Sequence, residues 1–212
     1  SSYNTGVGYG AGSAITTGIQ NTLIGGLAGD ALQDADYNVA IGTSALTSDT
    51  LGSRSTAIGT SALATQNLTS ATDVYNTALG FAAGQAVTTG IRNTLLGGLA
   101  GDALTEGGQN IAIGMNALSA DTKGSKNIAI GLDALQAQNF TSATDSYNVG
   151  IGHNAGQQVT TGIQNTLIGG LAGDALTDAD NNIALGYSAM TTNQLGSESV
   201  AIGTFALNSQ NP

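Results

Sequence analysis

The sequence predicts an all-β protein, a parallel β-solenoid of about twelve 17–21-residue coils, and three observations lead to that class. First, a 72-residue unit recurs almost verbatim, as the pairs Tyr3-Asn4, Tyr75-Asn76 and Tyr147-Asn148 show. Second, each unit holds four copies of the motif Asn-x-x-(Val/Ile/Leu)-Gly-x-x-Ala, at spacings of 17, 17, 17 and 21 along the chain. Third, each copy opens on a short, mostly β-branched run between Asn and Gly, which favours a strand over a helix. A short period of this kind is typical of a solenoid, in which one coil cannot bury its apolar face alone.

The motif copies divide the chain into twelve coils, and positions in a coil are numbered from the Asn of the motif, which is Ser in two coils. The coils begin at Asn4, Asn21, Asn38, Ser55, Asn76, Asn93, Asn110, Asn127, Asn148, Asn165, Asn182 and Ser199. We expect a single solenoid array over residues 1–212, made of the units 3–74, 75–146 and 147–212. No polar cap is evident at Asn211-Pro212, and solenoids generally need caps, so we interpret the chain as part of a longer fibre.

Positions 2 to 4 of each coil are expected to form a strand that is apolar on both faces. Position 2 is Thr, Val or Ile, position 4 is Val, Ile or Leu, and position 3 is Ala, Leu or Gly. Side chains alternate along a strand, so positions 2 and 4 share one face while position 3 lies on the other. One face can fill the interior of its own coil, whereas the other needs a cover. A sister chain is the simplest cover and predicts a homo-oligomer; a wide, flat monomeric solenoid is the alternative.

Three other positions are constant enough to interpret. Position 5 is Gly in all twelve coils, from Gly8 to Gly203, which indicates a tight turn with positive φ or a close backbone approach. Position 8 is Ala in every coil, as expected for a small side chain inside a narrow core. The Asn at position 1 is expected either to stack into a ladder of side-chain amides or to cap the turn before the strand.

The first two coils of each unit differ from the last two. The first two have Gly at position 9 and an apolar residue at position 12, as in Gly29 with Leu32. The last two have Leu or Met at position 9 and usually an apolar residue at position 14, as in Leu135 with Phe140. Close packing thus shifts apolar volume along the coil without losing it. The fourth coil also has four extra residues, near 69–72 and 141–144, and insertions of this kind map to one face of a solenoid.

Composition and charge argue against several classes of protein. Only 8% of the residues are charged, and the formal net charge at pH 7 is −10. A surface of this charge repels phosphate backbones, so we expect no nucleic-acid partner. No apolar run approaches the ~20 residues that span a bilayer, so we expect no membrane insertion. Ser1-Ser2-Tyr3 lacks the basic start and the apolar stretch of a signal peptide.

No residue pattern carries enzymatic chemistry, so we expect no enzyme, no catalytic, cofactor-binding or metal-binding residues and no cofactor. His153, the one histidine, lies at position 6, which varies freely between coils, and is expected in an exposed turn. With one His and no Cys, catalytic triads and histidine metal clusters are effectively excluded. The run Gly6-x-Gly8-x-Gly10 opens no helix and therefore does not indicate a dinucleotide site.

Two repeated patterns leave alternatives open. The segment 25–30, Gly-Gly-Leu-Ala-Gly-Asp, is similar to a calcium-binding nonapeptide, but it recurs only once per unit, and a solvated acidic turn is the competing interpretation. The acids near its three copies are Asp30, Asp34, Asp36, Asp102, Glu106, Asp174, Asp178 and Asp180. Threonine-rich positions suggest ice binding as a function. The doublet Thr16-Thr17 also recurs only once per unit, however, which is too seldom to match the regular spacing of an ice lattice.

Several coils resemble a known family of repeats. The segments Asn-Val-Ala-Ile-Gly-Thr-Ser-Ala at 38–45, Ser-Thr-Ala-Ile-Gly-Thr-Ser-Ala at 55–62 and Asn-Ile-Ala-Ile-Gly-Leu-Asp-Ala at 127–134 resemble the head repeats of trimeric autotransporter adhesins. They are also similar to repeat arrays of bacteriophage tail-fibre proteins, and the resemblance covers essentially the whole chain. It implies a left-handed parallel β-roll with three chains side by side in an extracellular adhesive or spacer fibre. The 17- and 21-residue coils are somewhat longer than the usual adhesin head repeat, so no receptor specificity is carried over.

These patterns favour a non-enzymatic structural or adhesive segment of an extracellular fibre, on a cell surface or a virion, that mediates surface attachment as a homotrimer. A host-surface glycan or protein receptor is the partner class that such a segment would contact. The alternative is a monomeric solenoid that binds ice or a polysaccharide on a flat face. The native mass separates the two, because the single chain has a mass of 20.8 kDa.

Overall fold

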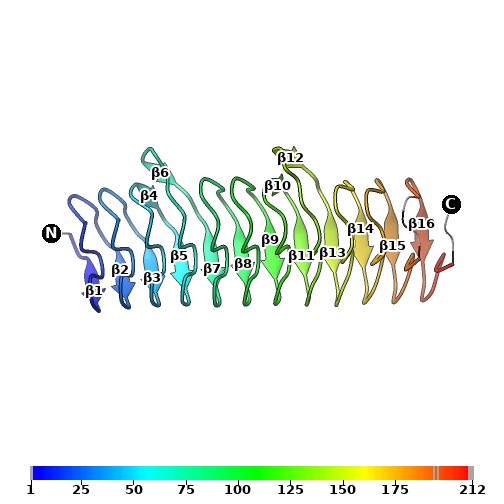
Figure 1. Ribbon diagram of the computed structural model, residues 1–212, viewed down its shortest axis with the longest axis horizontal. Helices are drawn as coiled ribbons and strands as arrows, with labels where there is room; N and C mark the ends of the chain where they lie inside the picture. Colours follow the sequence, from blue (N-terminus) through cyan, green and yellow to red (C-terminus); the bar gives the residue numbers. More distant parts are fainter. Residues whose placement is uncertain (1, 193, 195, 210–212) are drawn as a thin grey trace.

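The chain forms a rod of stacked coils. The computed structural model describes residues 2–192, 194 and 196–209, and each coil contributes one strand to a common sheet along the rod (Figure 1). The sheet has 12 strands in the order β1-β2-β3-β5-β7-β8-β9-β11-β13-β14-β15-β16, and all neighbouring strands are parallel. The strands are β1 (Thr5–Val7), β2 (Thr22–Ile24), β3 (Val39–Ile41), β5 (Thr56–Ile58), β7 (Thr77–Leu79), β8 (Thr94–Leu96), β9 (Ile111–Ile113), β11 (Ile128–Ile130), β13 (Val149–Ile151), β14 (Thr166–Ile168), β15 (Ile183–Leu185) and β16 (Val200–Ile202). The expected parallel β-solenoid of about twelve coils is confirmed.

Each strand lies at positions 2 to 4 of its coil, and the pairing keeps those positions in register throughout. Thr5 pairs with Thr22 and Val7 with Ile24, and the same pairing continues from coil to coil, including across the two unit boundaries. Equivalent positions therefore stack into straight rows along the rod. The rows, more than the single coils, are the units from which the surfaces of the molecule are built.

The two faces of the sheet have opposite environments. Position 3 points into the coil, so that Leu23, Ala40 and Leu95 are at most 1% exposed. Positions 2 and 4 point outward and are half-buried or exposed in every coil. The small-residue face is therefore the one that fills the interior. The β-branched face is the one left without a cover in the single chain.

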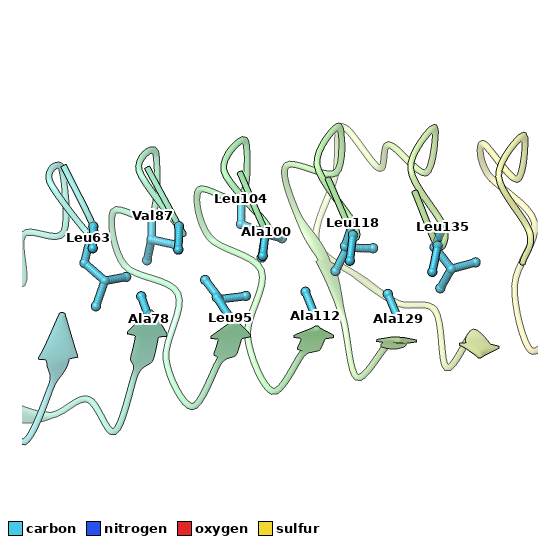
Figure 2. Close-up of a cluster of buried hydrophobic side chains, with 14 of the residues drawn as sticks. Leu63, Ala78, Val87, Leu95, Ala100, Leu104, Ala112, Leu118, Ala129 and Leu135 are labelled. Carbon is cyan, nitrogen blue, oxygen red and sulfur yellow. The ribbon is translucent and has the colours of Figure 1, made fainter. Parts of the chain in front are cut away.

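The interior is a thin apolar layer between the sheet and the opposite wall of each coil. Figure 2 shows Ala78 and Leu95 pointing from their strands toward Val87 and Leu104 on the facing wall. Burying a side chain of the size of Leu contributes about 1.5–3 kcal/mol. Because a described coil buries at most three such side chains, and several bury only one, each coil depends on its neighbours for stability.

The expected shift of apolar volume along the coil is confirmed, since Leu104 at position 12 of one kind of coil and Leu118 at position 9 of the other are both buried. A further exchange, between positions 3 and 9, was not predicted. In the second coil of a unit, Leu23 at position 3 occupies the space that a Cβ on Gly29 would need, at 2.8 Å from Cδ2 of the leucine. In the third and fourth coils position 3 is small, and the leucines at position 9, such as Leu118 and Leu135, are fully buried. A large residue at one position thus requires a small one at the other.

Glycine at position 5 is required by both of the expected causes at once. Gly114 has φ of 129°, a value that side-chain-bearing residues rarely adopt. A Cβ on Gly114 would also lie 2.4 Å from the carbonyl oxygen of Gly131, the equivalent glycine of the next coil. The same two constraints hold along the row, except that a Cβ on Gly203, in the last coil, would meet nothing within 4 Å.

The position-1 asparagines form a buried row that links the coils. Oδ1 of Asn93 accepts a hydrogen bond from the backbone N–H of Asn110 at 3.0 Å. Nδ2 of Asn93 donates to the carbonyl of Gly107, within its own coil, at 2.9 Å. The Asn93 side chain therefore satisfies one backbone group of the next coil and one of its own turn, whereas Nδ2 of Asn127 donates to Oδ1 of Asn110 at 3.2 Å. The two expected roles, a ladder along the axis and a local cap, are combined in one residue.

The four extra residues of the fourth coil form projecting loops, as expected. Two short parallel pairs support these loops: β4 (Gly52–Ser53) with β6 (Thr72–Asp73), and β10 (Gly124–Ser125) with β12 (Thr144–Asp145). The loops that carry β6 and β12 extend beyond the neighbouring coils along one edge of the rod (Figure 1). The sequence motif did not predict these pairs, because two-residue strands have no apolar alternation.

Candidate binding surfaces

The outward face of the 12-stranded sheet is a mainly apolar surface that runs along the rod. At its two ends the exposed fractions are high, as for Val7 (56%), Val200 (59%) and Ile202 (67%). With a spacing of ~4.8 Å between strands and ~3.3 Å per residue, the face measures roughly 600 Å². Exposed apolar patches of this size are at the upper end for a soluble monomer and typically mark an interaction site.

A second row of residues borders this face on the side where the strands begin. We call it the edge row: the residue directly before position 1 of each coil, namely Tyr3, Gln20, Tyr37, Arg54, Tyr75, Arg92, Gln109, Lys126, Tyr147, Gln164, Asn181 and Glu198. It contains three of the four basic residues and four of the six tyrosines of the chain. All twelve have φ between 50° and 65°, the left-handed region, so the backbone turns outward at each of them.

Four residues around Arg54 form what we call the first edge cluster: Tyr37, Arg54, Asp73 and Tyr75. The guanidinium of Arg54 lies 4.8 Å from the ring centre of Tyr37 and 6.0 Å from that of Tyr75. Nε of Arg54 donates to Oδ1 of Asp73 at 2.9 Å, and the hydroxyl of Tyr75 donates to Oδ2 of Asp73 at 3.2 Å. The β4–β6 pair holds the cluster together, because Arg54 follows β4 and Asp73 lies in β6. The hydrogen bond to Asp73 raises the pKa of Arg54.

The same arrangement recurs one unit later as the second edge cluster: Lys126, Asp145 and Tyr147. Nζ of Lys126 lies 2.6 Å from Oδ2 of Asp145, 3.0 Å from the hydroxyl of Tyr147 and 5.0 Å from the centre of its ring. The hydrogen bond to Asp145 raises the pKa of Lys126 to about 12. Gln109 takes the place of the first tyrosine of the other cluster.

The opposite border of the sheet, at position 6, carries a different set of exposed side chains. Tyr9, Phe81, Met115 and Tyr187 are all more than half exposed, and no charged side chain organises them. His153 lies in this row and is exposed, as the sequence predicts. The two borders of the apolar face therefore differ in kind, since the edge row has ordered polar clusters and the position-6 row has not.

A buried carboxylate lies beneath each projecting loop, and the sequence did not indicate it. Asp49 and Asp121, at position 12 of the third coil, are fully buried. Oδ1 of Asp121 accepts the N–H groups of Gly124 and Phe140 at 3.0 and 3.1 Å, and Oδ2 accepts Nε2 of Gln138 at 2.6 Å. Burial raises the pKa of Asp121. Both carboxylate oxygens accept hydrogen bonds from the protein, one of them from the residue just before the loop insert, so we interpret the site as a clasp for the loop.

Three acids of the first calcium-like segment accept hydrogen bonds from the protein, whereas Oδ1 of Asp102 and Oδ1 of Asp174 in the other two copies are buried without a hydrogen-bond partner among the described residues. Oδ1 of Asp30 accepts the hydroxyl of Thr47, and Oδ1 of Asp36 accepts the N–H of Ile19. Asp34 is exposed and accepts a hydrogen bond from Thr17. Within the described ranges, no group of three or more His, Cys, Asp or Glu side chains is arranged to hold a metal ion. Nor does any helix in that part of the chain have the length and apolarity to cross a membrane.

A threonine row lies at position 13 and includes the first threonine of the doublet that recurs once per unit. It consists of Thr16, Thr50, Thr88, Thr105, Thr122, Thr160 and Thr177, with Gln or Asn in the coils between. The hydroxyls donate to acceptors of the next coil, as Thr105 does to the carbonyl of Thr122 at 3.0 Å. These donors are already used, and the row is one residue wide.

A hollow of about 180 Å³ opens at the first coil and is lined by Gly6, Gly12, Ile15 and Leu23, among others. All four residues belong to the interior rows, so the hollow is the open end of the core and not a separate ligand pocket.

Comparison with known proteins gives no relative: no family model and no curated protein matches the sequence, and no solved structure matches the fold.

Proposed function

We propose that the chain is a non-enzymatic segment of an extracellular attachment fibre, on a cell surface or a virion, and that it works as a homotrimer. The observation that carries the proposal is the uncovered outward face of the sheet, which presents Thr, Val, Ile and Leu at positions 2 and 4 along the whole rod. Three rods with these faces directed toward a common axis bury them in a closed, symmetric assembly. The resemblance of the coils to adhesin head and tail-fibre repeats supports the same assembly and the same role.

The rod form suits a fibre. Twelve coils at ~4.8 Å each extend about 58 Å, and further coils could add length without a change of fold. The 12-stranded sheet makes the rod a continuous spacer, and the projecting loops recur every four coils, about 19 Å apart. Such a spacer can present several equivalent contacts to a surface.

Light scattering and a matched pair of variants test the assembly. The native mass is expected to be three times the chain mass of 20.8 kDa. Ile113→Lys places a charge in the middle of the outward face and is expected to give monomers. Gln85→Lys, on an exposed side chain outside that face, should leave the mass unchanged. A wild-type mass of one chain would overturn the trimer.

Attachment itself needs a separate test. Fluorescently labelled protein is applied to a panel of bacterial and animal cells, and retention on at least one cell type, competed by unlabelled protein, is expected. Absence of specific retention on every cell type would contradict the attachment function.

The second candidate, an ice-binding monomeric solenoid, is favoured by one observation, the threonine row at position 13. The hydroxyl groups of this row already donate hydrogen bonds within the protein, and residues such as Gln33 and Asn67 interrupt the row. Ice binding is therefore the weaker proposal. Thermal hysteresis of a protein solution separates the candidates. A monomer that depresses the freezing point relative to the melting point would favour ice binding.

A further inference from the structure

We propose that the two edge clusters are binding sites for a neutral oligosaccharide. The inference rests on the proposed function, because it names the ligand class that the attachment fibre would hold and the residues that would hold it. The first site is formed by Tyr37, Arg54, Asp73 and Tyr75, and the second by Lys126, Asp145 and Tyr147.

The chemistry of the clusters matches a sugar. A pyranose ring has an apolar C–H face, which packs against an aromatic ring, and hydroxyl groups that both donate and accept hydrogen bonds. Tyr75 and Tyr147 supply half-exposed rings, 51% and 47% exposed, each with a polar hydroxyl at its end. The adjoining Arg54–Asp73 pair supplies donors and acceptors side by side, which neighbouring hydroxyls require.

The clusters are ordered before any ligand arrives. The hydroxyl of Tyr75 is held by Asp73, and Arg54 is held between two rings. Exposed side chains usually lose rotamer freedom on binding, at a cost of about 0.5–1.5 kcal/mol each. Side chains already fixed by their neighbours avoid most of that cost. The position-6 row on the other border, where no charged side chain fixes Tyr9 or Phe81, lacks this property.

The charges favour a neutral ligand over an anionic one. Arg54 and Lys126 each have a carboxylate partner within 3 Å, so neither cluster has a surplus positive charge. The chain as a whole carries a formal net charge of −10, which repels polyanions. Hydrogen bonding and ring packing, and not charge attraction, are therefore the available sources of affinity.

The projecting loops add hydroxyl groups next to each cluster. Thr69 and Ser70 are exposed at the first loop, and Thr141 and Ser142 are exposed at the second. The loops lead through β6 and β12 directly into the acid and the tyrosine of each cluster. The two sites recur four coils apart, about 19 Å, on the same border, so a long glycan or a glycan-covered surface can engage both at once.

Another copy of the chain is the less suitable occupant. Charged residues are depleted in the core of protein interfaces, whereas the outward sheet face offers an apolar alternative beside the edge row. A contact between copies at the clusters is nevertheless one of the outcomes that the experiment separates.

The experiment measures binding of the intact protein to maltohexaose, cellohexaose, mannohexaose and galactohexaose on an array and by calorimetry, with heparin and polygalacturonate as anionic probes. The test variant combines Tyr75→Asn with Tyr147→Asn, because Asn tolerates the left-handed backbone of the edge row. The matched control is Asn181→Gln, in the same row and with the same left-handed backbone, two coils beyond Tyr147. Arg54→Gln keeps the ring and removes the charge pair at the first site. Native mass is recorded for every protein.

We expect at least one neutral hexasaccharide to bind, the double tyrosine variant to weaken its Kd at least about tenfold, and Arg54→Gln to weaken it several-fold. The control should bind as the wild type does. Binding to heparin or polygalacturonate alone, binding to none of the probes, or undiminished binding by the double variant would each overturn the inference. Loss of the native assembly in the double variant, with the control intact, would assign the clusters to contacts between copies and would also overturn it. These failures are distinct from failure of the proposed function, which would appear as a monomeric wild type or as absence of cell attachment.

Discussion

In the first two 72-residue units, the second and third coils fill position 12 of the interior in opposite ways. In the second coil of the middle unit, position 12 is Leu104, which packs against the strand residue Leu95 in a fully apolar layer. In the third coil the same position is Asp121, a fully buried carboxylate that binds Gly124, Phe140 and Gln138. At position 12 the second coil thus depends on apolar volume, and the third coil, which precedes the coil with the projecting loop, depends on hydrogen bonds.

The difference shows how a solenoid can carry a loop without losing its register. An apolar filler needs only a matching space, which the exchange between positions 3 and 9 provides. The carboxylate needs donors, and the loop supplies one of them from its own backbone, the N–H of Phe140. The loop is therefore tied to the interior by a buried acceptor, and its position relative to the edge clusters is fixed.

The largest loss of stability is expected at the position-5 glycines, which the second and third coils share. Gly114→Ala combines a strained φ of 129° with a contact of 2.4 Å to the next coil, and we expect a loss of more than about 4 kcal/mol in the free energy of unfolding. Urea unfolding monitored by circular dichroism measures it. Gly203→Ala is the matched control, since its φ of 123° is similar but its Cβ would meet nothing within 4 Å. Equal losses in both variants would show that strain alone matters.

Asp121→Ala and Leu104→Ala separate the two ways of filling the interior. Each should cost about 3 kcal/mol, the first through unsatisfied buried donors and the second through a cavity. Only Asp121→Ala is expected to free the loop at 141–144. Limited proteolysis of that loop, faster in Asp121→Ala than in Leu104→Ala, is the measurement. Equal cleavage rates would contradict the role of Asp121 as a clasp.

The buried carboxylate of Asp121 should also make stability depend on pH, with a smaller effect whose direction can be predicted. Burial raises the folded-state pKa of Asp121, so the folded protein binds a proton more readily than the unfolded chain does. The contribution of this group to stability is therefore full below its unfolded pKa of about 3.9 and is lost as the pH rises through the folded pKa. Burial raises the pKa values of Asp102 and Asp174 in the same direction. We expect the free energy of unfolding to fall from pH 4 toward neutral pH, with a smaller fall in Asp121→Asn; an unchanged slope in that variant would contradict the assignment.

The smallest change in stability is expected in the edge row, to which both the second and the third coil contribute a residue. Gln109 has φ of 61°, which costs a residue with a side chain more than it costs glycine. Gln109→Gly should therefore stabilise the protein by about 0.5 kcal/mol. Gln136→Gly, at a position without positive φ, should destabilise it. Thermal unfolding of both variants checks the opposite signs.

The strands and the packing rows were predictable because they depend on local pattern. The β-branched runs, the glycines from Gly8 to Gly203 and the inward alanines at position 8 all recur with the period of the coil, so the repeat itself reports their role. The same period located the loops near 69–72 and 141–144. Which strand face lies inside did not follow from the pattern, because both faces are apolar and only the width of the coil decides between them.

The candidate sites were not predictable, for two physical reasons. Asp121 has the sequence surroundings of a solvated turn acid, and only the fold of the next coil brings Phe140 and Gln138 to it. The edge clusters depend on left-handed backbone at residues such as Arg54 and Tyr75, which is imposed by stacking and not by residue type. Tyr37, Arg54 and Tyr75 are far apart in sequence and become neighbours only when coils stack.

The central claim is that the outward face of the sheet is covered by sister chains, and cysteine labelling tests it most directly. The chain has no native Cys, so Ile113→Cys places a single thiol in the middle of that face and Gln85→Cys places one on an exposed side chain elsewhere. The account predicts that a water-soluble maleimide modifies native Gln85→Cys rapidly and native Ile113→Cys only after unfolding, in a protein that keeps the mass of a trimer. Equally rapid labelling of both thiols in the native protein would contradict it.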